Sequence, residues 1–179
     1  IDITKRRALV CVESQIRNET SVPQTVRLHV DIDAAEGKRV ATFEGDTTTL
    51  KAGETVTLTA RRRIENLNFW SWGYGYLYKV RTSLSTGEKL TDEVCTTTGF
   101  RKTAFRDGMF YLNDRVLQLK GYAQRTSNEW PGVGMSVPAW MSDYSNRLMV
   151  ESNANLVRWM HVTPWKQDVE SCDRVGLIQ

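Results

Sequence analysis

Asn153-Ala-Asn-Leu-Val-Arg-Trp-Met-His161 is the stretch that decides the fold, together with Ser171-Cys-Asp-Arg-Val-Gly-Leu-Ile-Gln179 a few residues later. The apolar residues inside the first stretch predict a short strand, and the second stretch ends a helical pattern before turning apolar again. A strand, a crossover helix and the start of another strand are typical of a parallel βα series. Since the chain starts at Ile1 without a methionine and ends inside this pattern, we expect it to be part of a longer polypeptide.

A first helix is expected before the strand. Trp140, Tyr144 and Leu148 recur every four residues and therefore fall on one stripe of a helix. Pro138 is suited to the first turn of that helix, and Asn153 is suited to its end.

A second helix is expected after the strand. Thr163-Pro164 has the pattern of an N-cap followed by proline at the first helical position, and Gly176 is typical of a helix end. Trp165, Val169 and Cys172 are expected to line its inner face. Two and a half such units cannot close a barrel, so this half is interpreted as the opening of an α/β domain.

The first hundred residues have a different period. Val26, Leu28, Val30 and Ile32 alternate with polar residues, which predicts a strand with one buried face. The same pattern, or a compatible one, recurs in residues 7–17, 38–44, 56–62, 76–84 and 89–98. About seven short strands separated by turns indicate an antiparallel, immunoglobulin-like β-sandwich. The predicted fold is therefore a sandwich domain over residues 1–100, followed over residues 101–179 by the first βα units of an incomplete α/β domain.

Two smaller features lie near the junction. Met109-Phe-Tyr-Leu112 and Arg115-Val-Leu-Gln-Leu-Lys120 flank Asn113-Asp114, whose turn chemistry predicts a hairpin. An aromatic cluster over residues 69–78 could form a binding platform, but we interpret it as packing. Trp130 and Trp140, in the loop and helix start after the first strand of this half, are better placed to shape a ligand subsite.

Composition excludes several classes of protein. A hydrophobic fraction of 40% and a net charge of +3 fit a globular chain, and no basic stripe indicates nucleic-acid binding. No apolar run is long enough to cross a bilayer. The three cysteines show no metal-binding spacing, and we expect them to be buried free thiols. The compartment stays open, with a periplasmic or secreted location slightly favoured over a cytoplasmic one.

The order of several short motifs resembles glycoside hydrolase family 2, which contains β-galactosidases, β-glucuronidases and β-mannosidases. Each motif is weak alone, but together they span roughly residues 60–179. They are Asn66-Leu-Asn-Phe-Trp-Ser71, Tyr76-Leu-Tyr78, Gly99-Phe-Arg101, Phe110-Tyr-Leu-Asn113, Leu119-Lys-Gly121, Asn153-Ala-Asn-Leu-Val-Arg158, His161 and Cys172-Asp-Arg-Val-Gly-Leu177.

The resemblance implies that residues 101–179 are the first βα units of a truncated TIM barrel, the catalytic (β/α)8 domain. It also implies an enzyme that cleaves β-linked glycosides with retention, using two glutamates. In the family these glutamates lie on later barrel strands, so they would lie beyond Gln179 and the 179-residue chain would be inactive alone. No cofactor and no metal are implied. The implied partner is a carbohydrate, with no nucleic acid and no membrane, and self-association through the incomplete barrel is expected. The alternative is a non-catalytic carbohydrate-binding or interaction module of sandwich type.

The resemblance also implies two site residues. Arg158 matches the arginine that orients the nucleophilic carboxylate, and His161 matches a histidine that contacts the sugar. The alternatives are a salt bridge at the barrel bottom for Arg158 and a helix cap for His161.

The end of the first barrel strand departs from the family. The family has Gly-Val-Asn-x-His there, whereas this chain has Gly121-Tyr-Ala-Gln-Arg125. Gln124, Arg125 and Trp130 are therefore additional candidates for substrate contacts. Arg125 would favour an acidic sugar, although an external position for it is equally compatible with the sequence.

Overall fold

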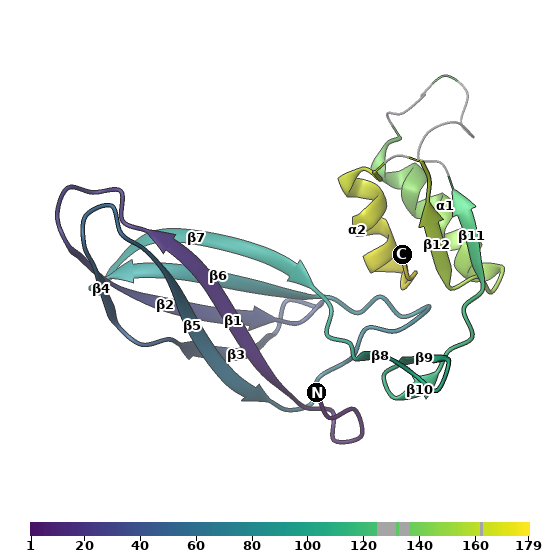
Figure 1. Ribbon diagram of the computed structural model, residues 1–179, viewed down its shortest axis with the longest axis horizontal. Coiled ribbons are helices and arrows are strands. Elements are labelled where there is room, and N and C mark those ends of the chain that lie inside the picture. Colours follow the sequence, from purple (N-terminus) through teal and green to yellow (C-terminus); the bar gives the residue numbers. More distant parts are fainter. Residues whose placement is uncertain (125–131, 133–136, 162) are drawn as a thin grey trace. The chain divides into compact units, whose positions relative to one another are not determined.

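A computed structural model of the protein describes residues 1–124, 132, 137–161 and 163–179 (Figure 1). The chain forms two compact units. The first contains Ile1–Leu67 and Tyr78–Thr98, and the second contains Asn68–Leu77 and Gly99–Gln179. Residues 68–77 therefore group with the second unit, although they lie between strands of the first.

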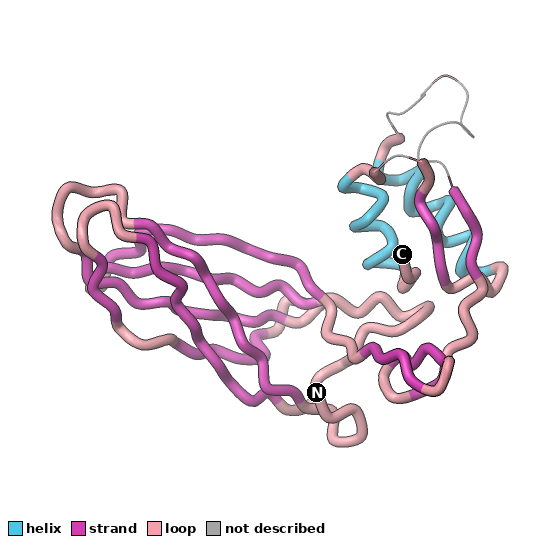
Figure 2. The backbone as a smooth tube through the Cα atoms, viewed as in Figure 1, coloured by secondary structure: helices cyan, strands magenta, loops and turns pink. Residues whose placement is uncertain are grey.

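The first unit is an antiparallel β-sandwich, and Figure 2 shows it built of strands and loops alone. One sheet pairs β1 with β5, and the other has the order β3-β2-β6-β7, with the short strand β4 also paired to β2. The seven strands are β1 (Ala8–Arg17), β2 (Gln24–Asp33), β3 (Arg39–Glu44), β4 (Thr48–Leu50), β5 (Thr55–Ile64), β6 (Tyr78–Thr86) and β7 (Lys89–Thr98).

The core of the sandwich confirms the predicted alternation. Leu28, Val30 and Ile32 are at most 1% exposed, and Leu58 and Val80 from other strands are also buried. Period-2 spacing thus places one face of each of these strands in the core.

The outer face of β2 carries charged side chains. His29 lies between two carboxylates, with Nδ1 3.2 Å from Glu44 Oε1 and Nε2 3.4 Å from Asp31 Oδ1. The hydrogen bond with His29 is the main cause of the lowered pKa of Glu44. These groups are partly or largely exposed, so the cluster is interpreted as a solvated cross-strand ladder.

The second unit begins with a three-stranded antiparallel sheet of β8 (Thr103–Arg106), β9 (Met109–Leu112) and β10 (Arg115–Val116). The predicted hairpin at Asn113-Asp114 is confirmed, and both residues have positive φ angles, 52° and 64°. Such angles are typical of two-residue type I′ turns. The sequence analysis missed the preceding hairpin between β8 and β9.

A parallel βα series follows, as predicted. It consists of β11 (Gly121–Gln124), α1 (Ala139–Glu151), β12 (Leu156–Trp159) and α2 (Lys166–Val175). β11 and β12 pair in parallel, and Ile178 forms a parallel bridge with Leu156, which marks the start of a third strand position. Within the described ranges these strands do not close into a barrel.

Two details of the helices differ from the predictions. Trp140, Tyr144 and Leu148 do share one stripe of α1, but that stripe is exposed, and the buried residues are Met141 and the polar Ser142 and Asn146. α2 begins at Lys166 with Trp165 as its N-cap, two residues later than Thr163-Pro164 predicted, although Gly176 ends it in the left-handed conformation as expected.

The apolar faces of the β11–β12 pair are only partly uncovered. Val157 is 1% exposed, because it packs with Cys172 and Leu177. Leu119 is 39% exposed. Self-association stays a prediction.

The aromatic segment, residues 68–77, serves as packing for the second unit. Its Trp70 Nε1 donates to the carbonyl of Asp173 at 2.7 Å, and Trp72 Nε1 donates to that of Ala154 at 3.0 Å. The last carbonyls of a helix have no partner within the helix, so the Trp70 indole satisfies one of these orphan groups in α2. The segment thus stabilises the carboxyl end of α2, which agrees with the interpretation as packing.

The cysteines are all free, but only one is buried. Cys11 and Cys95 are exposed, so the expectation of three buried thiols was wrong for these two. Cys11 lies on the exposed side of β1, and Cys95 lies on β7, where all residues but the last are exposed. Cys172 is fully buried, and burial, with smaller contributions from Asp173 and Asp168, raises its thiol pKa to about 12.

This contrast predicts the thiol chemistry of the 179-residue chain. At pH 8, a disulfide reagent such as DTNB is expected to react promptly with Cys11 and Cys95 and to reach Cys172 only on unfolding. The pKa of Cys172 is higher in the folded chain than in the unfolded chain. The contribution of the Cys172 thiol to stability is therefore fully present below pH 9 and is lost as the pH rises toward 12. Prompt reaction of three thiols in the native chain would contradict this placement.

Candidate functional site

β12 has two faces with different surroundings. Val157 and Trp159 point toward the helices and pack in the cluster that contains Cys172 and Leu177. Because side chains alternate along a strand, Arg158 points to the opposite face, and it is exposed. In a βα barrel, the face turned away from the helices is the interior.

Small residues on β11 make room on this face. Parallel pairing places Gly121 beside Leu156 and Ala123 beside Arg158. A Cβ atom at Gly121 would lie 3.1 Å from Leu156 Cδ2, so glycine allows the close approach. Ala123 therefore contributes only a methyl group beside Arg158.

The register between the two strands depends on Asn155, whose side chain is 3% exposed. Its Oδ1 accepts the N–H of Lys120 at 2.8 Å, and its Nδ2 donates to the carbonyl of Gln118 at 2.8 Å. The carboxamide thus joins the start of β12 to the residues before β11. A slip by one residue would move Arg158 to the other face, because the side-chain period of a strand is two.

Replacing Asn155 with alanine is therefore expected to lower the free energy of unfolding of the second unit by about 2 kcal/mol, since buried backbone groups lose their partners. All six tryptophans of the sequence fall in the ranges of this unit, so tryptophan fluorescence during urea unfolding reports its stability. Asn155→Asp keeps an acceptor for Lys120 but sets a carboxylate oxygen against the carbonyl of Gln118, so it should also be less stable than wild type. Equal stability of all three proteins would contradict the role given to Asn155.

Arg158 is free to meet a partner on the interior face. Within residues 1–124, 132, 137–161 and 163–179, no side chain forms an ion pair with it. A guanidinium presents a planar set of donors that fits a carboxylate. Such an arrangement keeps a nearby carboxylate ionised and restricts its rotation.

His161 follows the end of β12. It is exposed, and the peptide bond between Met160 and His161 is cis. The backbone N–H of Met160 donates to the carbonyl of Gln124 at 3.0 Å, which ties this end of β12 to β11. Arg158 and His161 therefore both occupy the carboxyl-terminal part of one strand and its exit, where barrel active sites gather.

The additional candidates have different surroundings. Gln124 points toward α1, because its Nε2 donates to Ser145 Oγ at 3.2 Å. Arg125 and Trp130 lie outside the described residues. Trp140 is 66% exposed on α1. Only Arg158 and His161 are thus shown together at the exit of a strand.

The described part of the chain contains neither a metal-binding cluster nor a membrane-spanning helix. No group of three or more His, Cys, Asp or Glu residues there could hold a metal ion. Of the two helices, neither is long and apolar enough to span a bilayer.

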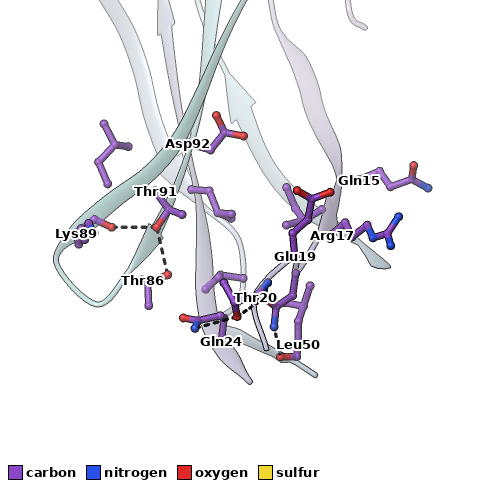
Figure 3. A pocket seen from close by; sticks show the side chains of 15 residues that line it. Gln15, Arg17, Glu19, Thr20, Gln24, Leu50, Thr86, Lys89, Thr91 and Asp92 are labelled. Atoms are coloured by element: carbon purple, nitrogen blue, oxygen red, sulfur yellow. Dashed lines mark hydrogen bonds between the residues drawn. The ribbon is translucent and has the colours of Figure 1, made fainter. Parts of the chain in front are cut away.

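A separate hollow of about 690 Å³ lies at one end of the sandwich (Figure 3). Polar side chains such as Gln15, Thr20 and Asp92 line it, together with Leu50 and Leu84. Its 15 lining residues include no aromatic ring. Because sugar rings are commonly bound by stacking on aromatic faces, this hollow is a poor carbohydrate site.

The fold and the site together define a class of protein: a β-sandwich followed by the opening strands of a βα barrel that carries polar residues at a strand exit. Comparison with family models identifies the class further. Residues 1–101 match the model described as "Glycosyl hydrolases family 2", and residues 103–179 match "Glycosyl hydrolases family 2, TIM barrel domain". The chain belongs to glycosyl hydrolase family 2, which confirms the resemblance and the fold class.

Individual relatives agree with this assignment. The chain is 28% identical over 178 residues to a beta-glucuronidase of Formosa agariphila, covering 99% of this chain and 18% of the relative. It is 27% identical over 154 residues to a beta-galactosidase of Thermoanaerobacterium thermosulfurigenes, covering 86% of this chain and 21% of the relative. The chain therefore spans about a fifth of the length of these curated relatives.

Solved structures show the same similarity. A family 2 member from Bacteroides cellulosilyticus matches with a TM-score of 0.88 and 27% identity, over 97% of this chain and 22% of that structure. A beta-glucuronidase from glycoside hydrolase family 2 matches with a TM-score of 0.87 and 28% identity, over 97% of this chain and 18% of that structure.

Proposed function

We propose that the full-length protein is a glycosidase that hydrolyses β-linked glycosides with retention of configuration. The observation that carries the proposal is the position of Arg158 on the face of β12 turned away from the helices, with no charged partner among the described residues. The family membership and the relatives named beta-glucuronidase and beta-galactosidase support the same chemistry.

In this proposal Arg158 acts on the catalytic nucleophile. Its guanidinium donates hydrogen bonds to that carboxylate, which lowers the carboxylate's pKa and fixes its orientation toward the anomeric carbon. His161 acts on the substrate, because an imidazole at the strand exit can donate to or accept from a sugar hydroxyl. Both roles need a sugar bound at the carboxyl ends of the barrel strands.

The two catalytic glutamates belong, in this proposal, to the polypeptide beyond Gln179. Retention requires two carboxyl groups about 5–5.5 Å apart, one as nucleophile and one as acid/base. Glu170 and Asp173 do not fit these roles, because they lie on α2 in the helical layer. The 179-residue chain is therefore expected to be inactive by itself.

Hydrolysis of a panel of 4-nitrophenyl β-glycosides by the full-length protein tests the proposal. The panel includes the glucuronide and the galactoside, and the 179-residue chain serves as the matched control. We expect turnover by the full-length protein alone. Absence of turnover on every member would favour a non-catalytic carbohydrate-binding module, and turnover by the 179-residue chain would refute the placement of the glutamates.

A further inference from the structure

A buried polar cluster joins the two helices of the second unit. Asp168 on α2 is 3% exposed, and Ser142 on α1 is 4% exposed. A buried carboxylate is costly unless hydrogen bonds compensate for the lost water. The burial of Asp168 is therefore explained by the hydrogen bonds that its two carboxylate oxygens accept.

Each oxygen of Asp168 has a separate partner. Its Oδ1 accepts the hydroxyl of Ser142 at 2.6 Å, and its Oδ2 accepts the backbone N–H of Trp165 at 3.1 Å. Trp165 is the N-cap of α2, and its carbonyl in turn accepts the N–H of Asp168 at 3.0 Å. A carboxylate in the first turn of a helix is also favoured by the helix dipole. Asp168 thus fastens the entrance of α2 to α1.

Asp168 thereby holds one end of the short connection between β12 and α2. The described residues of this connection are 160, 161 and 163–165, and they include His161. At its other end, the N–H of Met160 donates to the carbonyl of Gln124 on β11 at 3.0 Å. His161 therefore lies between two anchored residues, one held by a strand and the other by the buried carboxylate of Asp168.

We propose that Asp168, held by Ser142, is a positioning residue that sets the location of His161 for substrate binding. The inference rests on the proposed glycosidase function for its consequence, but the anchoring itself is independent of catalysis. Asp168 lies in the helical layer and does not touch the sugar. Its removal is expected to act on substrate binding only through His161.

Asn146 offers a matched control. It is 1% exposed, lies on α1, and donates from Nδ2 to Ser171 Oγ on α2 at 3.0 Å. It therefore contributes a buried polar contact between the same two helices without touching the connection that carries His161. Asn146→Ala should perturb helix packing as Asp168→Ala does, while leaving the N–H of Trp165 bonded.

A double-mutant cycle in the full-length protein separates positioning from general destabilisation. We compare kcat and KM of wild type, Asp168→Ala, His161→Ala and the double variant on the best β-glycoside substrate. Asp168→Ala is expected to lower kcat/KM about tenfold in the wild-type background, mainly through KM, and less than twofold in the His161→Ala background. The same fold-loss in both backgrounds, or an equal loss in Asn146→Ala, would overturn the inference.

Hydrogen exchange of the full-length protein, measured by mass spectrometry, tests the anchoring without activity. Peptides spanning residues 158–166 are expected to exchange at least tenfold faster in Asp168→Ala and at the wild-type rate in Asn146→Ala; unchanged exchange in Asp168→Ala would refute the anchoring. If wild type hydrolyses no β-glycoside, the proposed function fails while this measurement still decides the anchoring. Asp168→Asn, which retains one acceptor oxygen and therefore loses only one of the two bonds, replaces Asp168→Ala in both measurements if the latter does not fold, and a change in the same direction is expected.

Discussion

Replacing Arg158 with alanine in the full-length protein is expected to lower kcat/KM on a β-glycoside by about 10²-fold or more, the scale of losing one fixed electrostatic contact in an active site. The physical reason is that the nucleophilic carboxylate would lose its guanidinium partner and rotate more freely. Its pKa should also rise toward the ordinary value, so the acidic limb of the pH profile of kcat/KM should move to higher pH.

Two control variants sharpen this test. Arg147→Ala removes another exposed arginine of the same unit, on α1, and should leave kcat/KM within about twofold of wild type. Arg158→Lys keeps the charge but loses the paired donors, so it should fall between wild type and Arg158→Ala. Wild-type activity in Arg158→Ala would show that Arg158 does not serve the nucleophile.

Replacing Gly75 with alanine is expected to give the largest loss of stability, about 3 kcal/mol in the free energy of unfolding of the second unit. An added Cβ would lie 2.0 Å from the carbonyl oxygen of Arg174, in the carboxyl end of α2. A shift of either backbone would strain the hydrogen bond that the Trp70 indole donates to the carbonyl of Asp173 in the same part of α2. Tryptophan fluorescence during urea unfolding measures the change.

Gly108→Ala is the matched control in the same unit. A Cβ there would meet no atom within 4 Å, although its φ of 70° favours glycine. The expected cost is about 1 kcal/mol, from backbone strain alone. If Gly75→Ala were no more destabilising than Gly108→Ala, the close packing of the aromatic segment against α2 would be incorrect.

The sandwich could be predicted because its signal is local. Val26, Leu28, Val30 and Ile32 lie on one buried face, as alternation requires, and turns separate the strands. The β11–α1–β12–α2 order was equally readable from its periodicity and from Gly176. The first residue of α2 could not be predicted in the same way. The hydrogen bond that fixes Trp165 as the N-cap is accepted by Asp168, which is not a standard capping residue in this position.

Contacts between residues far apart in the sequence could not be predicted from the sequence. The partners of Trp70 and Trp72 lie 103 and 82 residues away along the chain. The stripe of Trp140, Tyr144 and Leu148 has the right period, but period alone does not say which side of α1 is buried. The buried side instead carries Ser142 and Asn146. These polar residues can be buried because they form hydrogen bonds with residues of α2, and the sequence alone does not show those partners.

The candidate site was partly predictable. Arg158 and His161 were found through motif order, and the structure places both at the exit of β12. Gln124 was chosen for its position at the end of a strand, but strand alternation directs it toward Ser145 on α1. Asp168 was missed, because nothing in its local sequence distinguishes a buried acid from a solvated one.

The central claim, that this chain opens the barrel of a retaining β-glycosidase, is tested most directly by the stereochemistry of the reaction. Proton NMR of the full-length protein acting on its best β-glycoside shows which anomer of the free sugar forms first. The account predicts the β-anomer, followed by slow mutarotation. The α-anomer as first product, or no release of sugar from any β-glycoside tested, would contradict it.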